Sequence, residues 1–203
     1  KIANMNAKSY EALRKKSRGK FSMVKFAQLK TLAKNTVGRS DAFLLKQMEI
    51  TIDIENQLDA KIDEIESQIL ECIRALNPPI LTIPGIGELT AAIILSEYGN
   101  INKFENPAQL LSFAGLEPGY YQSGLAEHQG HMVKHGSSHL RYALMNACLP
   151  LITYEPVFAE YYAKKRAEGK PHRVALTHVA KKLLRVIFTL QTKNISYDPT
   201  LIR

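Results

Sequence analysis

The sequence is poor in cysteine and has no long apolar run. Its two cysteines, Cys72 and Cys148, are far apart and lack a partner motif, which excludes a disulfide framework and a cysteine-based zinc site. No apolar stretch approaches the roughly 20 residues that a membrane-spanning helix needs, and no signal-peptide pattern opens the chain. These absences favour a cytoplasmic protein. Because the first residue is Lys, we also expect the chain to be part of a longer protein.

The chain does have a basic balance and enough apolar residues for a core. Its 203 residues are 45% apolar and 23% charged, which predicts one or two folded domains. Lys and Arg exceed Asp and Glu by 27 to 19, and the net charge of +8 favours polyanionic partners. Residues 161–185 hold Glu168 as their only acid beside a run of basic residues: Lys164, Lys165, Arg166, Lys170, Arg173, Lys181, Lys182 and Arg185. Such a run is either a solvated helix surface or a nucleic-acid contact.

Residues 1–40 are predicted to form a basic helical segment, and residues 41–77 a long coiled-coil helix. The apolar positions of the long helix follow the four-three step of a heptad, which is clean from the fifth position onward: Leu44, Met48, Thr51, Glu55, Leu58, Ile62, Ile65, Ile69, Cys72 and Leu76. A stripe this narrow needs one partner helix, from a second copy or from a segment folded back, and we expect a homo-oligomer. The alternative is a long helix that rests on a globular core. Ser40 or Asp41 supplies the N-cap, and Pro78 and Pro79 end the helix.

Residues 78–203 are predicted to form a C-terminal helical domain. Helical patterns cover residues 88–98, 107–113, 138–149, 157–167 and 173–192, with Pro150 and Pro156 as interruptions. Residues 115–136 are rich in glycine and are expected to form a loop with a small hairpin inside it. The predicted fold class is mainly α.

A helix-hairpin-helix motif is predicted at Ile83-Pro84-Gly85-Ile86-Gly87, which an apolar-faced helix follows. Gly85 and Gly87 permit a tight turn and close backbone approach, and the next helix aims its free N–H groups and its dipole at a phosphate. Ile86 is expected to plug the turn into the protein. We predict nucleic-acid contact at Gly85 and Gly87. The alternative is a glycine turn that packs two helices without a ligand.

The glycine-rich segment also contains Ser123-Gly124, a hydroxyl near imidazoles and cations. A serine can attack a phosphodiester if a base takes its proton and cations stabilise the phosphoryl oxygens. Lys134 and Arg141 suit the second role, Arg141 through bidentate contact with phosphate. The competing interpretations are a turn residue for Ser123 and a surface helix residue for Arg141.

Histidines three to four residues apart raise the question of a metal site. They are His128, His131, His135 and His139. Gly130 and Gly136 interrupt any common helix face, and Glu127 is the only carboxylate close by. We therefore predict no metal site in this chain and expect histidines that face solvent or phosphate.

Taken in order, these motifs resemble a known family. Residues 83–87, 110–118, 123–124, 134–136 and 140–141 are similar to the C-terminal domain of the insertion-sequence one-ten family of transposases, which includes Piv-type DNA invertases. The resemblance covers about residues 81–190, and the heptad helix is similar to the family's interdomain helices.

The resemblance implies a DNA transposase or recombinase that cuts and joins DNA through a serine, guided in the full-length protein by a structured RNA. The family's serine falls on Ser123, its Lys and Gly on Lys134 and Gly136, and its Leu-Arg pair on Leu140 and Arg141. Family members also carry an N-terminal RuvC-like domain with metal-binding acids, where a divalent metal such as Mg²⁺ is expected. That domain has no counterpart in this sequence, so we expect the chain to be inactive alone and to hold no cofactor.

Glu127 departs from the neutral or basic residue expected beside DNA. Two other functions stay open at this point. A non-enzymatic helix-hairpin-helix module would bind nucleic acid and dimerise without a catalytic serine. A histidine-ligated hydrolase would need a bound metal.

Overall fold

The computed structural model describes residues 2–36, 41–123, 126–132 and 135–202, and these residues are mainly helical, as the sequence predicts. The chain forms two compact units, Lys1–Leu58 and Asp59–Arg203, whose boundary falls inside the long helix α3 (Ala42–Leu76). The three-part division at residues 40 and 77 stays a prediction. Among the described residues, every helix is too short or too polar to cross a membrane.

The first unit opens with short helices that meet through aromatic rings. They are η1 (Ile2–Asn4), α1 (Ala7–Lys16) and α2 (Met23–Lys34). Asn6 caps α1 and Ser22 caps α2, each side chain accepting a hydrogen bond from a backbone N–H in the first turn. Tyr10 and Phe26 are buried, with ring centroids 5.4 Å apart. This contact joins the two helices.

Helix α3 begins and ends where the sequence predicts. Asp41 is its N-cap, because Oδ1 accepts a hydrogen bond from the N–H of Phe43 at 2.8 Å. At the other end Asn77 has a φ of +39°, and the two prolines that follow cannot continue the helix.

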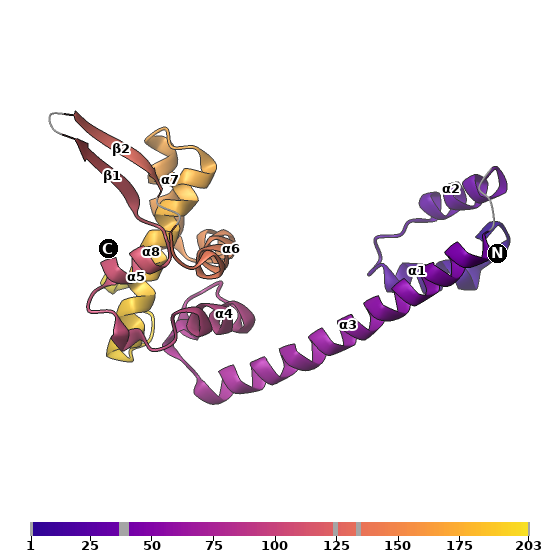
Figure 1. The fold of residues 1–203 in the computed structure, drawn as a ribbon, viewed down its shortest axis with the longest axis horizontal. Helices are drawn as coiled ribbons and strands as arrows, with labels where there is room; N and C mark the ends of the chain where they lie inside the picture. Colours follow the sequence, from indigo (N-terminus) through magenta and orange to yellow (C-terminus); the bar gives the residue numbers. More distant parts are fainter. Residues whose placement is uncertain (1, 37–40, 124–125, 133–134, 203) are drawn as a thin grey trace. The chain divides into compact units, whose positions relative to one another are not determined.

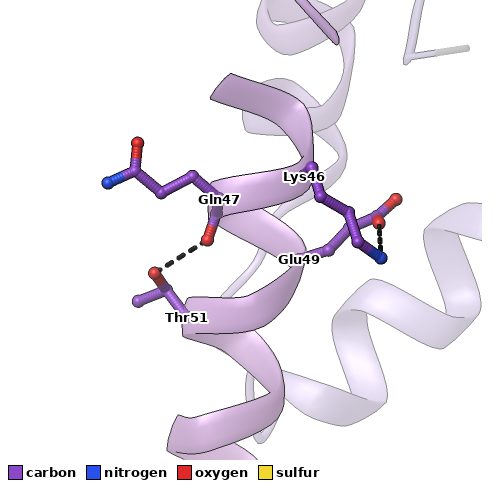
Figure 2. Close-up of polar contacts among 4 residues, drawn as sticks. All are labelled: Lys46, Gln47, Glu49 and Thr51. Atoms are coloured by element: carbon purple, nitrogen blue, oxygen red, sulfur yellow. Dashed lines mark hydrogen bonds and ion pairs between the residues drawn. The ribbon is translucent and has the colours of Figure 1, made fainter. Parts of the chain in front are cut away.

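Near its start, the surface of α3 carries local polar contacts only. Figure 2 shows the ion pair between Lys46 and Glu49 at 3.4 Å, and the Thr51 hydroxyl donating to the carbonyl of Gln47 at 2.9 Å. Both contacts join residues within about one turn of α3, so they stabilise this helix weakly and do not connect it to another element.

The heptad stripe of α3 is open to solvent. Leu58, Ile62 and Ile65 are 59%, 52% and 55% exposed. The described residues therefore do not support the alternative in which this stripe rests on a globular core. Pairing with a partner helix stays a prediction.

The second unit is built around α8. Its elements are the end of α3, η2 (Pro79–Thr82), α4 (Glu88–Tyr98), η3 (Ile101–Lys103), α5 (Pro107–Phe113), α6 (Ser138–Tyr154), α7 (Pro156–Ala167), α8 (His172–Lys193) and η4 (Pro199–Ile202). Helix α8 packs against α5, α6 and α7, and α4 packs against α6 (Figure 1). Leu183, Leu184 and Ile187 of α8 are fully buried in the resulting core. The helical pattern of residues 173–192 predicts this element correctly.

Helix α6 is longer than predicted. We expected Pro150 to end it, but it continues to Tyr154 with the proline inside. A proline removes one backbone hydrogen bond and crowds the preceding turn, and burial of neighbours such as Leu151 offsets that loss. The break falls instead at Glu155, which caps α7 with Pro156 in its first turn.

Strands β1 (Pro118–Ser123) and β2 (Ala126–Met132) form the small hairpin expected within residues 115–136. The strands are antiparallel, pairing Ser123 with Ala126 and Tyr121 with His128, with an irregularity near Pro118. In Figure 1 the hairpin extends away from the helices of the same unit. Much of the segment expected to be a loop is therefore strand.

Candidate nucleic-acid interface

Gly85 is the tightest point of the predicted helix-hairpin-helix turn. Its φ is +85°, and a Cβ at this position would lie 2.9 Å from the carbonyl carbon of Pro150 and 3.1 Å from the backbone nitrogen of Leu151. Ile83 and Ile86 on either side are 1% and 7% exposed. The burial of Ile86 confirms its predicted role as a plug. Gly85 thus lets the turn pack directly on the backbone of α6.

Gly87 has a different environment. It is the N-cap of α4, with φ −79° and ψ 161°, and no side chain caps the helix there. A Cβ on Gly87 would meet nothing within 4 Å, so the backbone at the start of α4 faces open space. The first N–H groups of a helix lack intrahelical acceptors and carry the positive end of its dipole. This end of α4 can therefore accept an anion.

The first turn of α4 already holds one anion of the protein itself. Glu88 accepts two hydrogen bonds from Arg74 at the end of α3, at 2.8 Å from Nε and 2.7 Å from Nη2. The hydrogen bond from Arg74 is the main cause that lowers the pKa of Glu88, and the same bond raises the pKa of Arg74. The fork of Arg74 thus neutralises the carboxylate beside the open helix end.

The two ends of the hairpin segment meet at a junction of glycines. Gly115 has φ +62° and Gly136 has φ +110°. A Cβ on Gly136 would collide with the carbonyl of Phe113, and one on Gly115 with the carbonyl of His135. The N–H of Ser137 donates to the carbonyl of Phe113 at 2.8 Å. Gly136, predicted to contact nucleic acid, lies here in close backbone packing.

The start of α6 completes this junction. Arg141 donates from Nη1 to the carbonyl of Ala114 at 3.0 Å, and so ties α6 to the end of α5. Ser137 caps α6 by accepting from the N–H of Leu140 at 3.0 Å, and its hydroxyl donates to Glu97 of α4 at 2.5 Å. Arg141, predicted as a phosphate clamp, has a protein contact in this structure, and its role toward phosphate stays a prediction.

Ser123 lies far from that junction. It is the last residue of β1, where β1 and β2 connect, and it is five positions from Pro118 at the base. An extended strand rises about 3.3 Å per residue, so roughly 17 Å separate Ser123 from the base. The structure therefore does not bring Ser123 together with Gly136 and Arg141. Lys134 lies outside the described residues.

A basic surface lies on α7 and α8. The pKa of His178 is lowered by burial first and then by the nearby cations Lys181, Lys165 and Lys170. The pKa of Lys181 is likewise lowered, by burial and then by Arg185. Cations from α7, from the connection to α8 and from α8 itself therefore lie close to His178, with Glu168 as an opposing charge. This excess of positive charge favours a polyanionic partner.

Two cations of this surface lie over aromatic rings. Lys182 Nζ lies 5.0 Å from the ring centroid of Tyr161 and 5.5 Å from that of Phe158. Lys165 Nζ lies 5.5 Å from the Tyr161 centroid and makes an ion pair with Glu168 at 2.9 Å. These contacts fix the ammonium groups in place, which lowers the entropy cost of binding a phosphate.

Sequence reasoning found the glycines and the basic run but missed the polar links between elements. Arg74 with Glu88 and Ser137 with Glu97 each join residues that are distant along the chain. Ser137 can be predicted as an N-cap because it directly precedes α6, but no local pattern predicts Glu97 as the partner of its hydroxyl. Across the part of the chain that the structure describes, no group of three His, Cys, Asp or Glu residues could hold a metal ion.

Comparison with known proteins identifies relatives of this chain. Residues 77–163 match the model of the Transposase IS116/IS110/IS902 family. The uncharacterized 43.6 kDa protein of insertion element IS110 from Streptomyces coelicolor is 32% identical over 66% of this chain and 34% of its own length. The pilin gene-inverting protein of Moraxella bovis is 30% identical over 72% of this chain and 46% of its own length.

A further relative is the transposase for insertion sequence element IS1111A from Coxiella burnetii, which is 28% identical over 76% of this chain and 41% of its own length. The chain thus spans about a third to a half of the length of these relatives. Residues 77–163 of this chain are thus similar to transposases of the IS116/IS110/IS902 family, and the three relatives agree with that match.

Proposed function

We propose that this chain is part of a transposase or recombinase that cuts and joins DNA, with Ser123 as the nucleophile. The family match supports the class of reaction, and two of the relatives are named as a transposase and as a gene-inverting protein. The observation that carries the serine assignment is its place at the connected end of the hairpin, away from the packed core. A residue there can reach a large substrate that the core could not admit.

The proposed step is a transesterification. The Ser123 oxygen forms a bond to the phosphorus of a DNA phosphodiester while the bond to one deoxyribose oxygen breaks. The serine proton leaves to a base, and the departing deoxyribose oxygen gains a proton. Attack by a hydroxyl of a second DNA strand then reverses the step and releases the serine. One phosphodiester is exchanged for another, so the sequence needs no energy source.

The nucleic-acid backbone is proposed to bind on two surfaces. The open end of α4 at Gly87 offers N–H groups to a phosphate, as the helix-hairpin-helix interpretation requires. The α7–α8 surface, with Lys165, Lys170 and Lys181 around His178, supplies positive charge. Lys134 and Arg141 are proposed to add phosphate contacts beside the hairpin.

The family resemblance also brings a divalent metal and a guide RNA into the proposal. The described residues offer no group of three ligands, so they do not fit a metal, and no step above passes through one. We assign Mg²⁺ to a RuvC-like domain elsewhere in the full-length protein. The guide RNA is proposed as a partner on the same resemblance, and the heptad stripe of α3 supports self-association of the chain.

The test uses the full-length protein with its RNA and a nicked DNA substrate that traps a covalent intermediate. We expect a protein–DNA adduct that survives denaturant and disappears in Ser123→Ala. Ser138→Ala is the matched control, because Ser138 is an exposed serine of the same unit and should leave the adduct intact. An adduct that persists in Ser123→Ala would reject the nucleophile. Binding without any adduct would favour the non-enzymatic binding module instead.

A further inference from the structure

We propose that α3 pairs with α3 of a second copy in parallel and in register, and that this pairing seats the partner helix in a groove between α3 and α4. The inference rests on the proposed self-association and adds its orientation and its second surface.

The heptad letters follow from the stripe. Leu58, Ile65 and Cys72 occupy d positions, and Ile62 and Ile69 occupy a positions. Ile62 is 52% exposed and Ile65 is 55% exposed, so no other helix of the described residues covers this part of the heptad stripe. A helix that repeats apolar residues every 3.5 positions buries them against another helix of the same kind.

Orientation follows from the residues that flank the seam. In this register Lys61 is at g, and Asp59 and Glu66 are at e. In a parallel pair each g residue faces the e residue five positions later on the partner, so Lys61 of each copy meets Glu66 of the other. The pair forms twice by symmetry.

An antiparallel pair cannot make this contact. It places g beside g and e beside e, and the g positions from residue 61 onward are Lys61, Gln68 and Ala75, none of which is acidic. The acids Asp59 and Glu66 at e would face each other or apolar residues. Charge complementarity therefore selects the parallel arrangement. Lys61 now makes an exposed bond to Glu64 at 2.7 Å, which is too weak to oppose the exchange.

In the structure, α4 covers the e side of the heptad stripe of α3 and leaves the other side open. Ile73, at an e position, is 3% exposed, and Arg74 next to it is bonded to Glu88 of α4. Beside this contact runs a groove of about 740 Å³, lined by Ile69, Cys72 and Leu76 of α3 and by Ala92, Leu95 and Ser96 of α4. Because one flank is occupied, the seam admits one further helix, which gives two strands.

The groove fits the partner's own sequence. In the parallel register the partner residue that faces Ile73 on the covered e flank is its Gln68, at a g position. Gln68 is uncharged, so it enters a largely apolar groove without burying a charge. The partner helix thus contacts α4 as well as α3.

Cys72 reports the orientation directly. In a parallel, in-register pair the two Cys72 side chains lie at the same level of the seam. In an antiparallel pair that overlaps over residues 58–76 they lie about 15 Å apart along the axis, at 1.5 Å per residue. We expect mild oxidation of the 203-residue chain to give a disulfide-linked dimer on a non-reducing gel. The matched control is Ala60→Cys with Cys72→Ser, which moves the thiol to an exposed f position and should not link.

Charge exchange provides the second measurement. Lys61→Glu or Glu66→Lys alone turns two attractive pairs into two repulsive ones, and each should weaken dimerisation about tenfold at low salt. The double exchange should restore it. Single variants that dimerise as well as the parent, or a dimer that fails to link through Cys72, would overturn the parallel arrangement and leave self-association standing. A chain that sediments as a monomer at all concentrations would overturn both, whereas the Ser123 adduct would be unaffected.

Discussion

Replacing Gly85 by alanine should destabilise the C-terminal unit strongly. A Cβ there would press on the backbone of Pro150 and Leu151 at 2.9–3.1 Å, and a φ of +85° is unfavourable for any residue with a side chain. The left-handed conformation costs about 1–2 kcal/mol, and forcing an extra carbon into packed backbone about 1–3 kcal/mol. The lower entropy of the unfolded alanine chain returns about 0.4–1 kcal/mol, which leaves a net loss of about 3 kcal/mol.

The measurement is chemical and thermal unfolding followed by circular dichroism. For a unit of this size a loss of about 3 kcal/mol lowers the Tm by roughly 6–12 °C. Gly87→Ala is the matched control two residues away, because its φ is −79° and a Cβ there meets nothing within 4 Å. A Gly85→Ala protein that unfolds within about 0.5 kcal/mol of the parent would refute the close packing of the turn against α6.

The same Gly87→Ala variant should bind DNA more weakly while keeping its stability, because the added carbon stands where a phosphate would approach α4; fluorescence anisotropy with a short duplex measures this, and unchanged affinity would argue against a phosphate at that helix end. Stability should fall as the pH drops below about 6.5, because the folded-state pKa of His178 lies below its unfolded value, so the unfolded chain takes up the proton first. His178→Gln should remove this part of the loss in urea titrations at pH 7.5 and 5.5, and an identical pH dependence in both proteins would contradict the assignment.

The long helix shows what sequence alone can predict. The heptad spacing and the flanking Asp41, Pro78 and Pro79 placed its ends within a residue, because capping and proline geometry act locally. The burial of Ile86 followed in the same way from the alternation around two glycines. Both features depend on residues that are close together along the chain, so the sequence alone predicts them.

Features that depend on tertiary packing were not accessible in this way. Pro150 looks like a helix break, yet α6 passes through it because the core on either side repays the lost hydrogen bond. Arg141 looks like a free cation, yet it donates to the carbonyl of Ala114. In each case the deciding partner is brought near by folding, from a position that no periodicity reveals.

The glycine junction at the base of the hairpin has a mechanical consequence. Gly115 and Gly136 clamp the two legs of a rod roughly 17 Å long, with Ser123 at its far end. A turn of ten degrees at such a hinge sweeps the tip through about 3 Å, close to the rise of one residue along the strand. A change of one methyl group at this junction would therefore move the backbone of Ser123, the proposed nucleophile, further than a change of the same size beside it.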